Sequence, residues 1–220
     1  MIDYFERISA GTFLGLLCII FLVAGCSRRP VPEPLTVKIL VHDFEVSDNI
    51  ESSPEEIRGW WFGSRDIRRN PNSGIIFADI LAREINEEVN PADVYSRTDY
   101  KYYLANKKRL LEEEYPSLNN QDIEALMNEI PPLDFARDLQ VDLLIIGNLN
   151  AAYTTHSRAF HWWSSVIDAS LMMLDVNTGD PVWTKDIRVR KNLGSQPSAM
   201  QKAADEITKD LKGDYFYKQD

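Results

Sequence analysis

The amino-acid sequence predicts an α/β domain, a layered fold in which helices flank a mixed β-sheet of about five strands. Three observations carry this prediction. Strand-like and helix-like segments alternate along the chain, residues 141–149 are nearly all apolar, and the short apolar segment before Cys26 suits a targeting segment that is kept out of the fold. The 220 residues are 44% hydrophobic and 26% charged, which is typical of a folded globular protein.

The N-terminal residues predict a targeting segment that does not belong to the fold. No charged side chain occurs between Ile8 and Ser27, and the strongly apolar core spans residues 13–24. A helix that crosses a bilayer needs about 20 apolar residues, so this shorter core suits a signal peptide better. We therefore expect residues 1–25 to be a signal peptide.

The residues that close this core resemble the lipobox of bacterial lipoproteins. Val23-Ala-Gly-Cys26 places small residues directly before a cysteine. The resemblance implies a lipoprotein signal peptide, cleavage before Cys26 and acyl chains such as palmitate on this residue, which attach the protein to a membrane. Ser27, where an aspartate would imply inner-membrane retention, implies an outer-membrane anchor with the domain in the periplasm.

An uncleaved signal anchor is the alternative for this segment. Asp3 and Glu6 offset the positive charge of the N-terminal region, while Arg28 and Arg29 follow the apolar core. This charge distribution favours retention of the C-terminal side in the cytoplasm. In that case Cys26 would be an ordinary apolar residue.

Charge and cysteine content exclude several classes of function. The formal net charge is −10, from 24 basic and 34 acidic residues, and no long basic stretch occurs. A nucleic-acid binder needs a basic face, so nucleic acid is not expected as a partner. Cys18 would leave with the signal peptide and Cys26 would be acylated, so thiol catalysis, a structural disulfide and cysteine metal sites are excluded.

The folded domain is expected over residues 35–216, after a tether at residues 26–34 with three prolines. Residues 35–44 are rich in β-branched side chains, and apolar and polar residues alternate at first, which predicts the first strand. Residues 45–73 read as a long connection, and such connections are usually functional. Apolar residues then recur at helical spacing over residues 75–89, up to Pro91.

A helical section follows a short predicted strand at residues 93–96. Helices are expected at residues 98–115, 121–129 and 133–139, and prolines separate them. The charged blocks of the first helix are interpreted as a solvated face rather than an ion site.

The C-terminal part predicts a central strand, a hairpin and a last helix. The apolar run at residues 141–149 is typical of a strand buried on both faces. Strands at residues 166–176 and 182–189 are joined by Asn177-Thr-Gly-Asp180, which suits a hairpin turn. Residues 198–211 predict an amphipathic helix.

Five segments in this order resemble periplasmic lipoprotein domains of the CsgG, LpoB and TolB N-terminal type. They are residues 37–44, 76–85, 94–97, 138–147 and 174–183. The resemblance covers residues 36–211 and implies an α/β fold that serves several different functions in the envelope. The long helical section and the aromatic segments have no counterpart in the pattern.

Neither a metal site nor an enzyme active site is expected. The three histidines, His42, His156 and His161, do not form a motif with metal-ligand spacing, and His42 is expected to make a hydrogen bond at a strand end. No nucleophile elbow, phosphate-binding loop or dinucleotide fingerprint occurs, so no cofactor is expected. Asp43 and Asp168 are the carboxylates best placed for a hydrolase, but abundant acidic residues make this choice uninformative.

Two aromatic clusters are the main candidates for partner binding. Both lie in predicted connections, and together they hold four of the five tryptophans. Such rings either cover one end of the sheet as a satellite core or dock a partner, because tryptophan is enriched in interface hot spots. The candidate residues are Trp60, Trp61 and Phe62, and then Phe160, His161, Trp162 and Trp163.

The sequence therefore favours a non-catalytic, lipid-anchored adaptor or assembly factor that binds an envelope protein. One alternative is an oligomeric secretion component like CsgG, which would need membrane-crossing hairpins with alternating residues. The two large insertions, residues 45–73 and 98–139, lack that alternation. A second alternative is an envelope glycan hydrolase.

Overall fold

The computed structural model describes residues 36–47, 65–90, 92–157 and 162–217. The chain divides into a unit of residues Met1–Leu35 and a unit of residues Thr36–Asp220, and all described residues belong to the second unit. The expected signal peptide, Cys26 and the tether lie outside the described residues. Their assignment remains a prediction.

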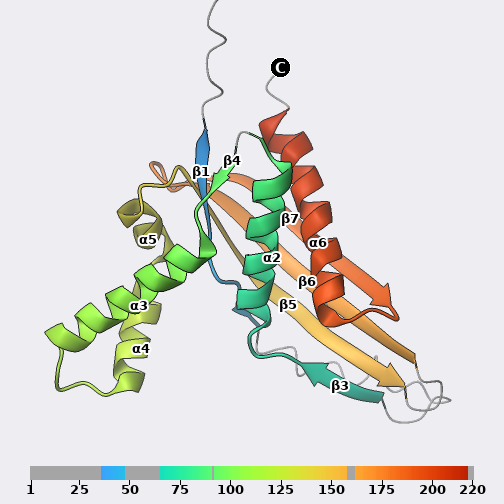
Figure 1. Ribbon diagram of the computed structural model, residues 1–220, viewed down its shortest axis with the longest axis horizontal. Coiled ribbons are helices and arrows are strands. Elements are labelled where there is room, and N and C mark those ends of the chain that lie inside the picture. Colours follow the sequence, from blue (N-terminus) through green and yellow to red (C-terminus); the bar gives the residue numbers. More distant parts are fainter. Residues whose placement is uncertain (1–35, 48–64, 91, 158–161, 218–220) are drawn as a thin grey trace, which may run out of the picture. The chain divides into compact units, whose positions relative to one another are not determined.

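A mixed sheet forms the centre of the second unit (Figure 1). Its main strands run in the order β4 (Ala92–Val94), β1 (Val37–Val41), β5 (Leu143–Ser157), β6 (Trp162–Asp175) and β7 (Pro181–Asn192). Strand β1 is parallel to both β4 and β5, whereas β5, β6 and β7 are antiparallel. The predicted α/β class with a mixed sheet is confirmed.

Two further strands lie within the segment that the sequence predicted as a connection. Strand β2 (Glu45–Val46) is parallel to β5, and β3 (Arg65–Arg69) is antiparallel to it. The physical reason is the length of β5, which has 15 residues while β1 has only 5. Strands β1, β2 and β3 therefore follow one another along the same edge of β5, where an unpaired backbone would otherwise be exposed.

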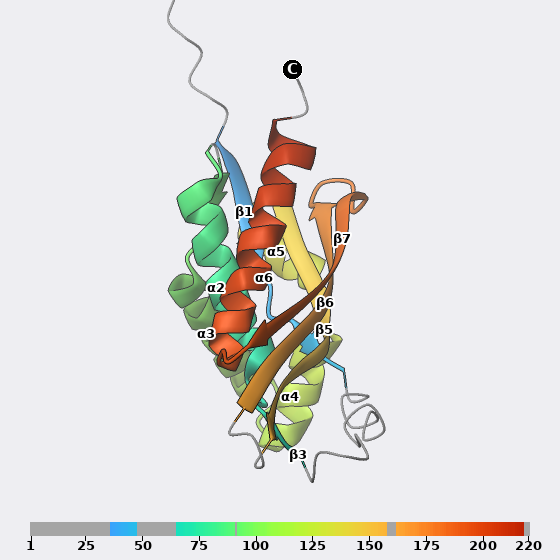
Figure 2. The same cartoon turned by 90° about the vertical axis from the view of Figure 1, so that its right-hand side faces the viewer.

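Helices α2 (Ser73–Glu88) and α6 (Gln196–Leu211) cover one face of the sheet (Figure 2). The short helix η2 (Lys212–Phe216) continues α6. Both long helices are amphipathic, so their apolar faces bury the main hydrophobic core against the sheet. This core includes Phe77, Leu81, Ile85, Met200 and Ile207, all of which are buried.

The other helices form a second, smaller core on the opposite face. Helices α3 (Arg97–Glu114), α4 (Asn120–Glu129) and α5 (Pro132–Asp138) confirm the predicted helical section. Leu40, Leu144, Tyr100, Phe135 and Val176 are buried together there. No helix within the described residues is long and apolar enough to cross a membrane.

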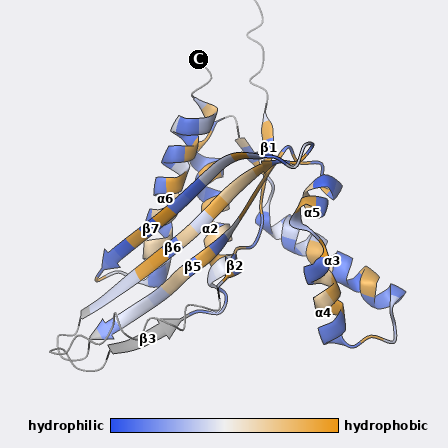
Figure 3. Ribbon diagram, turned by 180° about the vertical axis from the view of Figure 1, so that it is seen from behind, coloured by the Kyte–Doolittle hydropathy of each residue, from blue (hydrophilic) through white to orange (hydrophobic). Residues whose placement is uncertain are grey.

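The central strand differs from its prediction because only its first part is covered on both faces. Leu143, Leu144 and Ile145 are buried, but Asn148 and Asn150 are exposed. The reason is that α5 contacts the first part of β5, while α3 and α4 lie to the side of the sheet (Figure 3). Among the described elements, no helix covers the rest of β5, β6 and β7 on this side, which is called the open face below.

The hairpin of β5 and β6 is also longer than predicted. Residues 151–157 and Trp162-Trp163 were expected in a connection because the segment is not periodic, but they are strand residues. Polar side chains hold this part together across the strands, with the hydroxyl oxygens of Thr154 and Ser165 2.8 Å apart. Such pairs stabilise a hairpin without the apolar alternation that identifies a strand in a sequence.

Candidate functional site

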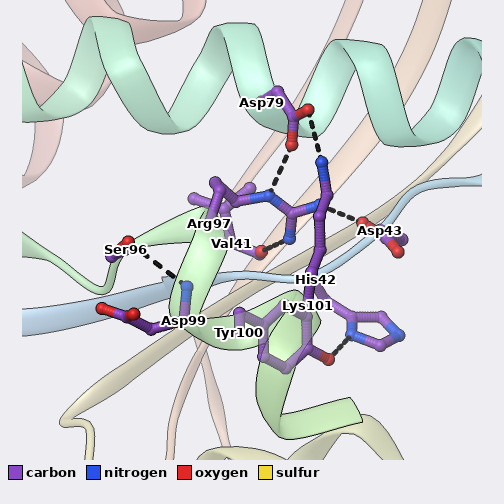
Figure 4. Close-up of polar contacts among 9 residues, drawn as sticks. All are labelled: Val41, His42, Asp43, Asp79, Ser96, Arg97, Asp99, Tyr100 and Lys101. Atoms are coloured by element: carbon purple, nitrogen blue, oxygen red, sulfur yellow. Dashed lines mark hydrogen bonds and ion pairs between the residues drawn. The ribbon is translucent and has the colours of Figure 1, made fainter. Parts of the chain in front are cut away.

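A network of ionic side chains lies at the carboxyl end of β1 (Figure 4). Arg97 is at its centre, with only 10% of its side chain exposed. Its guanidinium donates hydrogen bonds to the carbonyl oxygen of Val41 at 2.7 Å and to Asp79 at 2.9 Å, and it forms an ion pair with Asp43. Arg97 therefore joins β1, α2 and the start of α3.

The local sequence places Arg97 at this point. Ser96 lies two residues after the end of β4 and accepts a hydrogen bond from the backbone N–H of Asp99, which caps α3. Arg97 is consequently the first residue of the helix. Lys101, one turn later, donates to Asp79 at 2.7 Å. Burial works against the charged form of Asp79, but hydrogen bonds from Lys101 and Arg97 outweigh it and lower the pKa of this carboxyl.

His42 and Tyr100 continue the network into the second core. The Nδ1 atom of His42 lies 2.5 Å from the hydroxyl oxygen of Tyr100, and the His42 ring stacks on Phe135 at 6.2 Å. The Arg97 guanidinium lies 5.4 Å from the centre of the Tyr100 ring. The predicted hydrogen bond of His42 at a strand end is thus confirmed. Burial raises the pKa of Tyr100, so its hydroxyl stays protonated.

Acidification is expected to destabilise the domain through His42. Burial lowers the pKa of His42 below its usual value of about 6.5, an effect that Asp43 opposes and Arg97 reinforces. The unfolded chain binds the proton more readily, so the stability that His42 contributes is present above pH 6.5 and lost as the pH falls below it. Urea midpoints measured between pH 7.5 and 5.5 should decline, and His42→Gln should flatten this decline. An equal decline in the variant would contradict the assignment to His42.

A groove of about 380 Å³ opens beside His42 and Asp43, on the open face of the sheet. One row of residues crosses it in register from strand to strand. Glu45 of β2 pairs with Asn148 of β5, Asn148 with Ser170 of β6, and Ser170 with Asp186 of β7.

A second row lies beside the first, displaced from it by two residues in each of the strands β5, β6 and β7. Ile146 of β5 pairs with Met172 of β6, and Met172 pairs with Thr184 of β7. The exposed fraction of Met172 is 38%, which is unusual for a central strand. The groove therefore has an apolar strip next to a polar row.

The predicted aromatic candidates are only partly within the described residues. Trp60, Trp61 and Phe62 lie outside them, as do Phe160 and His161. Trp162 and Trp163 are the first two residues of β6 rather than part of a loop, and 39% of Trp163 is exposed.

The carboxylates considered for hydrolysis occupy different surroundings. Asp43 is an ion-pair partner of Arg97, whereas Asp168 lies within β6, where its carboxylate is 3.8 Å from the Nε atom of Arg188. No group of three metal-ligating side chains occurs in the part of the chain that the structure describes.

Arg97 and the groove were not identified from the sequence. The sequence signal for Arg97 is its position directly after the predicted strand at residues 93–96.

No protein-family model and no curated protein sequence matches this chain. Several solved structures resemble part of it. The PelC dodecamer of Paraburkholderia phytofirmans is 9% identical, with 77% of this chain and 84% of that chain covered and a TM-score of 0.45. Lipoprotein GNA1162 of Neisseria meningitidis is 11% identical, with 80% and 99% covered and a TM-score of 0.45. The LpoB C-terminal domain of Escherichia coli is 12% identical, with 70% and 82% covered and a TM-score of 0.31. Bacterial lipoproteins are thus among the structural neighbours.

Proposed function

We propose that this chain is a lipid-anchored envelope protein that acts without catalysis, as an adaptor or assembly factor for a periplasmic or outer-membrane protein. The lipobox-like residues before Cys26 support the anchor. The absence of a recognisable catalytic motif supports a binding role. One structural observation carries the proposal, namely the exposure of Trp163 on the β5–β6 hairpin.

Trp163 is placed for contact with another molecule. It belongs to a hairpin whose strands have 15 and 14 residues, and it lies next to the end of this hairpin, opposite His156. With 39% of its surface exposed, the ring retains apolar area that a partner would cover. Tryptophan contributes more than most residues to interface hot spots, so this end of the hairpin is the favoured docking surface.

Crosslinking in intact cells tests the docking surface. A photoreactive amino acid at position 163 should capture a specific envelope protein, whereas the same group at Tyr115, exposed at the end of α3, should not. Capture of the same proteins from both positions, or of none from position 163, would overturn the proposal.

Replacement of Trp163 by Ala should separate docking from packing. Because the ring is partly exposed, the free energy of unfolding should fall by less than the 3–5 kcal/mol that is typical of a buried tryptophan, about 1 kcal/mol. Recovery of the crosslinked partner from a neighbouring position should fall strongly. Trp183, which packs against the main core, is the matched control, since Trp183→Ala should cost more stability but retain the partner. A large stability loss at Trp163 with intact capture would identify it as satellite core.

Membrane attachment is expected to depend on Cys26. Cys26→Ser should leave an uncleaved precursor without acyl label, because the lipidated thiol is lost. Metabolic labelling with a palmitate analogue and the mobility of the product in a gel measure both effects. If the variant is still processed at the same bond, the segment is an ordinary signal peptide.

A further inference from the structure

The open groove on the sheet has a chemistry that the docking end of the hairpin does not share. We propose that it binds an extended, cationic segment of a protein, with two basic side chains four residues apart and an apolar side chain between them. This inference rests on the proposed function, in that it names the chemistry of a partner segment. It concerns a different surface from Trp163.

The spacing of two carboxylates sets the length of the segment. Glu45 and Asp186 stand at the two ends of the row that crosses β2, β5, β6 and β7. Neighbouring strands are about 4.8 Å apart, so three spacings separate these residues by about 14 Å. An extended peptide rises about 3.4 Å per residue, so it covers this distance in four residues.

The charge of the groove determines the sign of its occupant. Glu45 and Asp186 are both exposed, and neither forms an ion pair with any described residue. Asp43, the remaining acidic residue of the groove, is already paired with Arg97. No lysine or arginine is among the described residues that line the groove, so the carboxylates of Glu45 and Asp186 favour a ligand with two positive charges.

The middle of the groove favours an apolar side chain. Ile146 and Met172 form the strip beside the polar row, and Met is an adaptable contact for apolar groups. In an extended peptide, residues i, i+2 and i+4 point to the same side. Basic residues at i and i+4 would meet Glu45 and Asp186, and an apolar residue at i+2 would lie over the strip.

The polar groups between the two carboxylates suit a peptide backbone. Asn148 and Ser170 lie in the middle of the row, where the Asn148 amide can hydrogen-bond to main-chain groups. The Ser170 hydroxyl already accepts a hydrogen bond from Asn150 at 2.9 Å, and its own proton can be donated to a main-chain carbonyl. A linear polyamine could also carry two charges at this distance. The part of a polyamine between its terminal amines has no amide groups to pair with the polar row. Any charged amine in that part would lie against the apolar strip, which is unfavourable. The observations therefore favour a protein segment over a polyamine.

Binding of a synthetic peptide to the detergent-extracted full chain tests the proposal. The probe is a fluorescent peptide Gly-Lys-Ser-Leu-Ser-Lys-Gly, and its anisotropy should report binding that weakens as salt is raised. Glu45→Gln and Asp186→Asn should each weaken binding about three-fold, and the double variant about ten-fold, as is typical of exposed ion pairs. Asp93→Asn on β4 is the control, since it makes the same change in net charge away from the groove and should leave affinity unchanged.

A groove-blocking variant gives an independent measurement. Ser170→Arg places a cation between the two carboxylates and should abolish peptide binding, while capture of a partner from position 163 stays as it is. Equal binding of spermine, equal binding of a Glu-Ser-Leu-Ser-Glu peptide, or an equal effect of Asp93→Asn would overturn the proposal. Partner capture without peptide binding would overturn the groove assignment alone, whereas peptide binding without capture would overturn the docking role of Trp163 alone.

Discussion

Replacement of Arg97 by Met is expected to lower the free energy of unfolding by about 3 kcal/mol, the lower end of the range for breaking a buried ion pair. Methionine keeps part of the side-chain volume but removes all the donors. The carbonyl oxygen of Val41 then loses its 2.7 Å bond, and Asp43 and Asp79 lose their shared cation. The two carboxylates are partly exposed, so water offsets part of this loss.

Urea denaturation of the Arg97→Met variant measures this effect, and Lys101→Met is its matched control. Lys101 also binds Asp79, but 46% of its side chain is exposed, so its removal should cost less than about 1 kcal/mol. Arg97→Lys should lower the free energy of unfolding almost as much as Arg97→Met. The compact ammonium group of lysine cannot reach all three acceptors that the planar guanidinium group contacts, namely the Val41 carbonyl and the two carboxylates. Equal, small losses for all three variants would show that Arg97 is not central to the network.

The sequence predicted those elements of the fold that have a clear period or a clear terminator. The helix observed as α2 has apolar residues at helical spacing before Pro91, and α4 begins at the capping box of Asn119. The hairpin turn at Asn177-Thr-Gly-Asp180 was also confirmed, since Gly179 has a φ of 79°. Local chemistry specifies these features, so one sequence is sufficient to identify them.

The features that the sequence did not reveal depend on contacts between distant segments. Strands β2 and β3 form only because β5 offers an unpaired edge beyond β1. The row from Glu45 to Asp186 joins residues that are 141 positions apart, and no spacing rule connects them. Trp163 was identified as a candidate from its residue type, but its exposure depends on the length of the β5–β6 hairpin.

Replacement of Gly74 by Ala is expected to destabilise the domain by about 3 kcal/mol, the upper part of the usual range for overpacking. A Cβ atom at position 74 would lie 1.9 Å from the carbonyl oxygen of Phe44 and 3.0 Å from its carbonyl carbon. These are backbone atoms, so no side-chain rotation relieves the clash. Helix α2 and the segment that leads into β2 must therefore move apart, although alanine favours a helix by up to about 1 kcal/mol over glycine.

Gly213 in η2 provides the matched control, because it is also helical but a Cβ atom there meets nothing within 4 Å. Gly213→Ala should leave the urea midpoint unchanged or raise it slightly, whereas Gly74→Ala should lower it clearly. The displacement should also reach the groove, since Phe44 precedes Glu45 and the N–H of Ser47 donates to Leu149 at 3.1 Å. Amide chemical shifts of Val46 and Ser47 should therefore change in Gly74→Ala and not in Gly213→Ala. Unchanged stability in both variants would mean that the Phe44 carbonyl does not lie close enough to Gly74 to clash with a Cβ atom there.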